Sequence, residues 1–290
     1  MSWFLLAFST AFFESIRDVF NKKALKDINE YVVAWSLMFF SFLFLSPVLL
    51  FIEIPTLESK FWIALLSGGF LNTIAHLALI KALKISDLSK VAPITTFTPL
   101  FILITSPFMI GEFPNSVGLM GIGLIVVGCY VLNLKERQKG YLAPLRSLFA
   151  ETGSRLALLV AFLWSISSNF DKIGVQNSSP LFWVISLFLC MSLMMLPLVL
   201  ASPRINQQQI IRGLKDLVLI GIFNAITVAI QMTAITLTLV AYVIAVKRTS
   251  ALFSVGFGYF IFQEKEVKER LAGAAIMVLG VVLITLSNFF

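Results

Sequence analysis

The sequence predicts an all-α integral membrane protein, and three observations support that prediction. Hydrophobic residues make up 59% of the 290 residues and charged residues only 13%, whereas soluble domains average about 45–50% and about 25%. The mean hydropathy is +0.95. The apolar residues form runs of about 20, the length that an α-helix needs to cross a bilayer. This composition excludes a soluble enzyme and a disordered chain, because neither can hold so much apolar surface.

Ten segments have the length and composition of transmembrane helices. Backbone groups in lipid must be hydrogen-bonded within each helix or by barrel closure, and uninterrupted apolar runs do not fit the alternation of a β-barrel. The predicted spans are residues 2–20, 31–52, 61–82, 91–110, 115–134, 155–173, 181–201, 216–238, 240–262 and 270–289. They leave no connection long enough for a soluble domain.

Lysine and arginine residues are distributed unevenly over the connections. Odd-numbered connections and the adjoining helix ends carry 18 of the 22, and even-numbered ones carry only Lys60 and Lys172. Basic residues concentrate in cytoplasmic loops. We therefore expect both termini outside, in the plasma (inner) membrane. The net charge of +7 is explained by these loops, so no nucleic-acid partner is expected.

The two halves of the chain repeat each other. At an offset of 150 residues, Ser36, Leu37 and Pro47 match Ser186, Leu187 and Pro197; at an offset of 152, Gly69, Asn72 and Glu112 match Gly221, Asn224 and Glu264. The predicted organisation is a first repeat over residues 1–134, a cytoplasmic linker over 135–154 and a second repeat over 155–290. Because each repeat holds five helices, the second enters the membrane in the opposite sense. Inverted repeats build alternating-access carriers, with the substrate near the midplane.

Several fragments resemble ten-helix members of the drug/metabolite transporter superfamily, with two EamA-type domains. They are ALKISDLSKVAPITTFTPLF and Gly111-Glu112 in the first half, and FLWSISSNFDKIG, FQEK and AGAAIMVLGVVLI in the second. The second half departs at Gln263-Glu264, where Gly-Glu is usual. The resemblance covers nearly the whole chain. It implies a secondary carrier of small organic metabolites with a central cavity.

Lys247 and Arg248 are adjacent cations inside the ninth span, and no acidic residue lies between Asp216 and Glu264. A charge at the centre of a membrane helix costs about 2.5–3.5 kcal/mol or more, and such residues are usually functional. We expect an anion site, in which Arg248 binds phosphate or carboxylate through two hydrogen bonds and Lys247 supplies a point charge. The alternative is a structural ion pair with Glu14, Asp18 or Asp171.

The same fragment resembles the ninth helix of the plastid triose-phosphate translocators, in which a Lys-Arg pair binds the substrate phosphate. That similarity maps onto Lys247 and Arg248 only. The translocators also use a lysine in the fourth helix, where the matching position here is Thr95, counted back from Pro99. This difference leaves carboxylates open as substrates.

Glu14, Arg17 and Asp18 lie on one face of the first span, because their spacings are i, i+3 and i+4. A structural ion pair is one interpretation. The other is a proton-coupling role for Glu14, the deepest of the three, since a buried carboxylate can carry a proton. The small multidrug resistance branch of the superfamily resembles this arrangement, with a coupling glutamate in its first helix.

Further candidate substrate-binding residues are polar or aromatic and lie at membrane depth. Each pair on one helix shares a face; the candidates are Asn72 with His76, Asn224 with Gln231, and Trp164. Interhelical hydrogen bonding is the alternative for the amides. Asn72 and Asn224 are repeat mates and are expected to approach each other.

Two other groups are expected to be structural. Asp171 and Lys172 end the sixth span, where we expect an ion pair at the outer surface. Glycines of the fifth and tenth spans allow close packing within the chain or in a homodimer; they are Gly118, Gly121, Gly128, Gly273 and Gly280.

Three functions remain open. The first is a secondary carrier of a small organic anion through Lys247 and Arg248. The second is a proton-coupled exporter of amino acids or cationic amphiphiles through Glu14, and the third is a non-transporting membrane scaffold. No enzymatic activity, cofactor or metal is expected, because one histidine, His76, cannot form a multi-histidine centre. The expected partners are a small-molecule substrate and the lipid bilayer.

Overall fold

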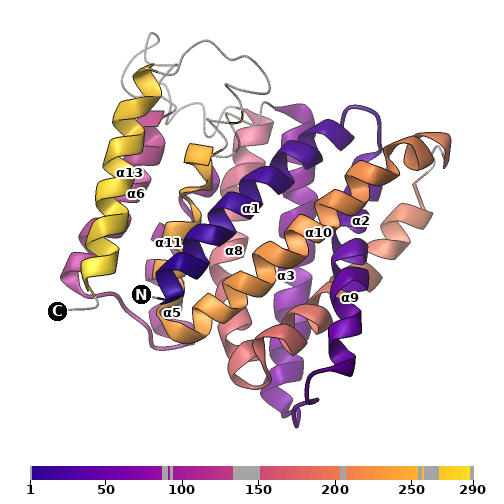
Figure 1. The fold of residues 1–290 in the computed structure, drawn as a ribbon, viewed down its shortest axis with the longest axis horizontal. Coiled ribbons are helices and arrows are strands. Elements are labelled where there is room, and N and C mark those ends of the chain that lie inside the picture. Colours follow the sequence, from indigo (N-terminus) through magenta and orange to yellow (C-terminus); the bar gives the residue numbers. More distant parts are fainter. Residues whose placement is uncertain are drawn as a thin grey trace.

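The structure is a computed structural model that describes residues 2–86, 91, 94–132, 151–202, 207–253, 257 and 268–287. Every regular element among these residues is a helix (Figure 1). In chain order they are α1 (Ser2–Ala24), α2 (Glu30–Leu45), the 3-10 helix η1 (Ser46–Leu50), α3 (Ser59–Ile85), α5 (Thr98–Met109), α6 (Ser116–Leu132), α8 (Thr152–Gln176), α9 (Pro180–Leu200), α10 (Gln207–Leu237), α11 (Val240–Lys247) and α13 (Lys268–Leu286). The predicted all-α class is confirmed.

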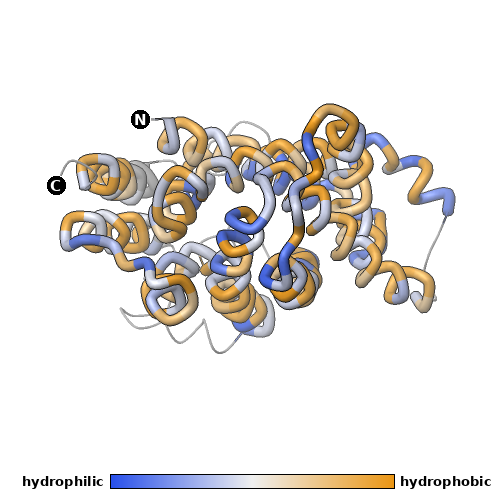
Figure 2. Tube along the Cα trace, turned by 90° about the horizontal axis from the view of Figure 1, so that it is seen from below, coloured by the Kyte–Doolittle hydropathy of each residue, from blue (hydrophilic) through white to orange (hydrophobic). Residues whose placement is uncertain are grey.

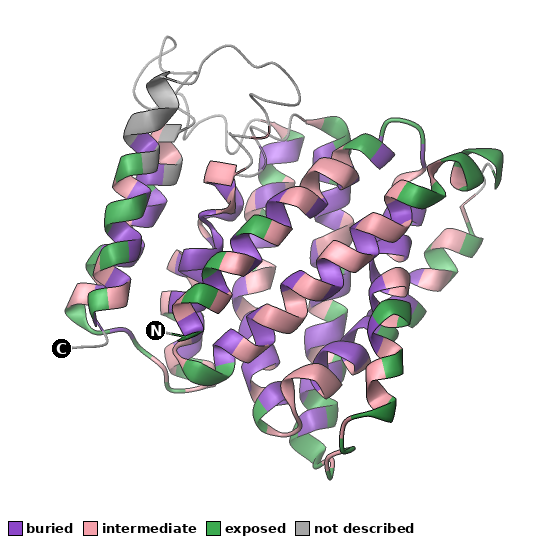
Figure 3. Cartoon of the chain, in the orientation of Figure 1, coloured by how far each residue is buried: buried purple, intermediate pink, exposed green. Residues whose placement is uncertain are grey.

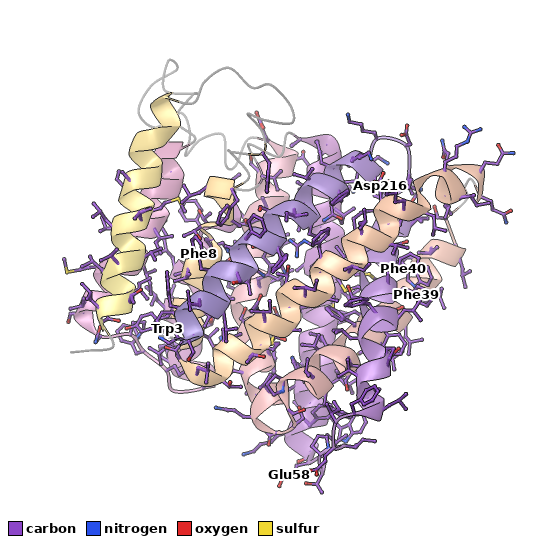
Figure 4. All side chains as sticks on the ribbon, in the orientation of Figure 1. Trp3, Phe8, Phe39, Phe40, Glu58 and Asp216 are labelled. Atoms are coloured by element: carbon purple, nitrogen blue, oxygen red, sulfur yellow. The ribbon has the colours of Figure 1, made fainter. Side chains whose placement is uncertain are left out.

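Within the described parts of the chain, five helices are long and apolar enough to cross a bilayer. They are α2 with η1, α3, α8, α9 and α10. Apolar residues dominate every helix in Figure 2, and Figure 3 shows buried faces turned inward with exposed faces on the outside. Figure 4 shows the acidic side chains of Glu58 and Asp216 far apart along the bundle, with largely apolar side chains between them.

Several helices begin or end where local chemistry requires it. The Asn29 side chain accepts a hydrogen bond from the Tyr31 amide at 2.9 Å and caps α2. Ser179 caps α9 in the same way, and Pro180 occupies its first turn. Between α5 and α6, Gly111 has φ of 70°, which only glycine adopts without strain.

Three predicted spans differ clearly from the helices observed. The fourth, expected over 91–110, is interrupted by a turn at residues 96–97, and α5 begins at Thr98. The helix α10 begins at Gln207 rather than near residue 216, because its first turns are polar and hydropathy alone does not detect them. The ninth span was expected to run from 240 to 262, but α11 ends at Lys247 and a turn follows at residues 248–249. Residues 258–262 of that span and residues 133–150, which hold most of the predicted linker, lie outside the described part of the chain.

The main helix contacts are repeated when the two halves are exchanged. The first helix of each half packs on the third helix of the other, in the pairs α1 with α10 and α8 with α3. Equivalent helices also pack on each other, in the pairs α2 with α9, α5 with α11 and α6 with α13. The start of α1 and the end of α13 lie at the same end of the bundle (Figure 1).

A lysine near the end of the first helix of each half caps the third helix of that half. Lys22 Nζ donates to the carbonyls of Leu83 and Ser86 at 2.8 and 3.1 Å. Lys172 Nζ donates to the carbonyls of Ile235 and Thr238 at 2.7 and 2.9 Å. A lysine there satisfies carbonyls that a helix end leaves without partners. We call the two ends of the bundle the Lys22 end and the Lys172 end.

The glycines of α6 and α13 pack within the chain. A Cβ on Gly121 would lie 2.7 Å from the Gly280 carbonyl oxygen, and one on Gly128 would lie 2.7 Å from the Gly273 carbonyl oxygen. These contacts lie within the chain; a homodimer stays a prediction.

Candidate functional site

The candidate site lies where two repeat-equivalent helices are interrupted. A turn at residues 96–97 precedes α5, and a turn at residues 248–249 follows α11. These positions are 152 residues apart, the offset of the sequence repeat. Broken helices in membrane transporters leave backbone groups and helix ends facing the substrate. The break places Lys247 at the end of α11 and Arg248 in the turn.

Lys247 is buried and paired with an acid from another helix. Its Nζ lies 3.1 Å from Glu14 Oε1 of α1 and donates to Gln231 Oε1 of α10 at 2.7 Å. The structural ion pair that the sequence left open is therefore present. Glu14 is 2% exposed and Lys247 8%, so the pair sits in a medium where separating the charges is costly.

Arg17 extends this pair along α1. Its guanidinium contacts Glu14 Oε1 at 3.2 Å and Asp18 Oδ1 at 2.8 Å, and it donates to Asn224 Oδ1 at 3.2 Å. Asn224 in turn donates to Ser41 Oγ at 3.0 Å. The i, i+3, i+4 cluster predicted on α1 is confirmed, and it joins α1 to α2, α10 and α11.

Arg248 faces the opposite wall of the site. Its guanidinium carbon lies 5.0 Å from the ring centroid of Trp164 on α8, a cation–π geometry. It also donates to Thr98 Oγ1 at 3.4 Å. The His76 ring meets the same indole edge-on at 5.6 Å. Trp164 therefore holds a cation on one side and an imidazole on another.

Asn72 and Asn224 do not bond to each other. Ser167 Oγ donates to Asn72 Oδ1 at 3.1 Å, and Asn224 binds Arg17 and Ser41. Ser167 and Arg17 are themselves repeat mates at an offset of 150 residues, so each asparagine bonds to the equivalent position on the first helix of the other half. Both asparagines line one cavity, but their described hydrogen bonds go to these other side chains and not to each other.

Two cavities meet at this site. The one nearer the Lys172 end has a volume of about 540 Å³ and is lined by Asn72, His76, Asp171, Asn224, Gln231 and Lys247, among others. The one nearer the Lys22 end has a volume of about 440 Å³ and is lined by Asp18, Leu83, Thr95 and Ser250, among others. Four side chains line both and divide them: Glu14, Arg17, Trp164 and Arg248. All the candidate residues named from the sequence therefore line one cavity or both.

Charges of opposite sign are equal in number among the described residues around these cavities. The charged side chains of these residues are three acids, Glu14, Asp18 and Asp171, and three bases, Arg17, Lys247 and Arg248. In the part of the chain that the structure describes, no group of three His, Cys, Asp or Glu side chains is placed to hold a metal ion.

Asp171 and Lys172 are not the surface ion pair that was predicted. Asp171 is 5% exposed and its Oδ1 accepts from Trp183 Nε1 at 3.1 Å. Lys172 pairs with Glu112 Oε1 at 2.9 Å, and Glu112 Oε2 accepts from the Val240 amide at the start of α11. Consecutive side chains on a helix point about 100° apart, so Asp171 faces the cavity and Lys172 faces the helix ends. Trp164, Ser168 and Asp171 are spaced i, i+4 and i+7 and so share a helix face; this was the sequence signal that could have placed Asp171 in the cavity.

Comparison with known proteins identifies the family. Residues 1–134 and 152–286 both match the EamA-like transporter family. The chain belongs to that family. The EamA-type resemblance of its motifs is thereby confirmed, and the chain is a membrane protein of the drug/metabolite transporter type.

A solved structure described as "Crystal structure of protein" has the same fold. It superposes with a TM-score of 0.75 over 98% of this chain and 96% of the other, at 16% sequence identity. At that identity the likeness shows the fold alone. No curated protein matches.

Proposed function

We propose that this EamA-family protein is a secondary transporter of a small organic anion, which binds against Arg248 and Lys247 and is exposed to the two sides in turn. The observation that carries the proposal is the position of Arg248. It lies in the break of the ninth helix, contacts Trp164 and lines both cavities. A guanidinium on an indole can bind a carboxylate through its N–H groups while the ring packs against the apolar part of the ligand.

Neighbouring side chains supply the remaining contacts of the proposed site. Asn72, Asn224 and Gln231 offer amides and His76 an imidazole in the larger cavity, and Thr95 lies in the smaller one. Phe188 and Met191 add apolar surface. Aromatic carboxylates of modest size fit this combination of one cationic anchor and apolar walls.

The topology that we propose has ten crossings in two oppositely inserted repeats. The symmetric packing of the halves and the equivalent lysine caps support it. The Lys22 end, where basic connections cluster, would be cytoplasmic. In intact cells, a maleimide that cannot cross membranes should label Ser2→Cys and not Arg212→Cys; the reverse pattern would contradict this orientation.

A ligand panel tests the proposed substrate class. Purified protein in detergent is heated with benzoate, pyruvate, succinate, inorganic phosphate, glutamate or tetraethylammonium. A ligand at 100 times its Kd adds about 2.7 kcal/mol of stability, so benzoate or another anion is expected to raise the Tm. Arg248→Gln should abolish the shift, whereas Arg212→Gln, an exposed arginine on α10, should retain it. Labelled benzoate should then exchange across proteoliposome membranes.

Stabilisation by tetraethylammonium alone would favour the second candidate, an exporter coupled to protons through Glu14. One observation favours that candidate: Glu14 Oε2 is buried without a hydrogen-bond partner. Glu14→Gln would then abolish cation binding. Under the anion proposal, that variant lowers stability through the lost ion pairs but keeps the preference for anions.

A further inference from the structure

Asp171 is a cavity carboxylate held by a neutral donor. It lies on α8, lines the larger cavity with Lys247 and Glu14, and accepts a hydrogen bond from the Trp183 indole. The other two acids of the cavities have cationic partners at hydrogen-bond distance: Arg17 and Lys247 contact Glu14, and Arg17 contacts Asp18. Asp171 has no ion pair among the described residues.

The position of Trp183 depends on a glycine. A Cβ on Gly174 would lie 2.2 Å from the Trp183 ring, so only glycine lets the indole lie against α8 one turn from Asp171. Trp183 is fully buried and packs edge-on against Phe61 at 5.7 Å. The carboxylate is thus fixed by a rigid aromatic group that satisfies one oxygen without neutralising the charge.

The helices around α8 bring few charges to Asp171. The segments α5 and α9 carry no charged side chain. Across the cavity, α3 contributes His76, α10 contributes the neutral Gln231, and α11 contributes Lys247, which acts on Asp171 electrostatically. Arg248 borders the same cavity, together with Glu14 and Arg17 of α1. On α8 itself, Lys172 faces away and pairs with Glu112.

Adding an anion upsets the charge balance of the cavities. Among the described residues, three acids and three bases line them, so a monoanion bound among these side chains adds one negative charge that they do not compensate. Uncompensated buried charges are costly, and a carboxylate commonly escapes the cost by taking up a proton. Asp171 is the acid whose described partner is neutral, so its protonation breaks no ion pair.

We propose that Asp171 binds the proton that accompanies the anion, which makes the protein a proton–anion symporter. The inference rests on the proposed function. A proton from water adds to a carboxylate oxygen of Asp171, giving the neutral acid as the monoanion binds at Arg248. Both leave together, and the proton returns to water on the other side. Trp183 is a positioning residue, which donates to Oδ1 in both forms.

Proton counting tests the symport. Benzoate binding to the purified protein is measured by calorimetry in two buffers of different ionisation enthalpy. The wild type is expected to take up about one proton per benzoate, and Asp171→Asn none. Asp216→Asn is the matched control, because that carboxylate pairs with Lys23 outside the cavities, and it should keep the wild-type value. Binding without proton uptake in the wild type overturns the symport and leaves the anion proposal standing.

Infrared spectroscopy tests Asp171 without any ligand. As the pH is lowered from 9 to 4, the ligand-free wild type should gain a carboxylic acid C=O band that is missing in Asp171→Asn and retained in Glu14→Gln. In Trp183→Phe the band should move to higher frequency, because the indole hydrogen bond is lost, rather than disappear. A band that survives in Asp171→Asn, or is lost in Glu14→Gln alone, assigns the proton to Glu14. If benzoate fails to bind, the proposed substrate is wrong, and this measurement still decides where the proton sits.

Discussion

Two corners of the molecule are built from equivalent helices and differ in charge. In one corner α1 packs on α11, and in the other α8 packs on α5. The first corner holds Glu14, Arg17, Asp18, Lys247 and Arg248; the equivalent positions of the second are Trp164, Ser167, Ser168, Thr95 and Thr96. The same helix packing therefore supports a charged corner and a neutral one. Duplication explains the fold, and the substitutions between the halves carry the chemistry.

A second set of differences between the halves places an acidic residue on α8 rather than on α1. Asp171, Gly174 and Trp183 correspond to Asn21, Ala24 and Val33 at an offset of 150 residues. The second half places an acid, a glycine and a bulky donor where the first half has an amide and two aliphatic side chains. Opposite walls of the cavities thus differ in polarity, which a symmetric dimer of identical repeats could not achieve.

The largest expected effect is in the charged corner. Lys247→Met leaves Glu14 buried with one fewer cation, and breaking a buried pair costs about 3–5 kcal/mol. Thr95→Val, at the equivalent position of the neutral corner, should cost about 0.5–1.5 kcal/mol. Unfolding in detergent micelles measures both. The double variant Glu14→Gln, Lys247→Met should lose less than the sum of the singles; strict additivity would show that the pair is not coupled.

The lysine caps should stabilise both halves. Hydrogen bonds from charged groups contribute about 1.5–3 kcal/mol, so Lys22→Met should lower the free energy of unfolding by that amount. Lys172→Met should lower it by more, because it also breaks the ion pair with Glu112. Lys26→Met, at an exposed position near Lys22, is the control and should have little effect. If either variant unfolds with the wild-type free energy, the lysine replaced in it does not stabilise the helix end that it caps.

Substitution of Gly174 should lower the free energy of unfolding somewhat less than loss of a lysine cap. Gly174→Ala forces the Trp183 ring to move, and overpacking costs about 1–3 kcal/mol. Adding Trp183→Val and Asp171→Asn recreates the trio of the first half and should recover most of the loss in the same unfolding assay. Failure to recover would mean that the two halves differ there in backbone as well as in side chains.

The smallest loss of stability is expected at an exposed ion pair outside the cavities. The pair of Lys23 and Asp216 spans 3.0 Å, with the Lys23 side chain 62% exposed. Exposed pairs contribute about 0–1 kcal/mol and weaken with salt. Lys23→Ala should therefore change the Tm little, and less still in 1 M salt. A loss comparable to that of Lys247→Met would show that burial does not set the difference between the two pairs.

The sequence predicted the segments well and the partners poorly. Hydropathy and the repeat located a helix in each of the ten segments, because apolar length is a local property. Of the three partners considered for Lys247, which were Glu14, Asp18 and Asp171, the structure shows Glu14 of α1. The sequence could not choose among them, because all three are distant from Lys247 in the chain. The position of a residue along a helix can be predicted from the sequence. Which side of the helix faces the centre of the bundle cannot, so Asp171 was assigned to the surface. The Trp183 contact depends on Gly174, whose role appears only when two helices are placed together.

The glycine contacts of α6 and α13 constrain how the halves can move. Cβ atoms on Gly121 and Gly280 would each meet the other glycine's carbonyl oxygen within 2.7 Å, so the two backbones leave no room to slide. The helix α6 belongs to the first half and α13 to the second, and the two form a tightly packed pair at the edge of the bundle (Figure 1). If the two halves rotate relative to each other, we expect the contact between α6 and α13 to stay fixed and to lie near the rotation axis. Gly111, between α5 and α6, is where the backbone could bend.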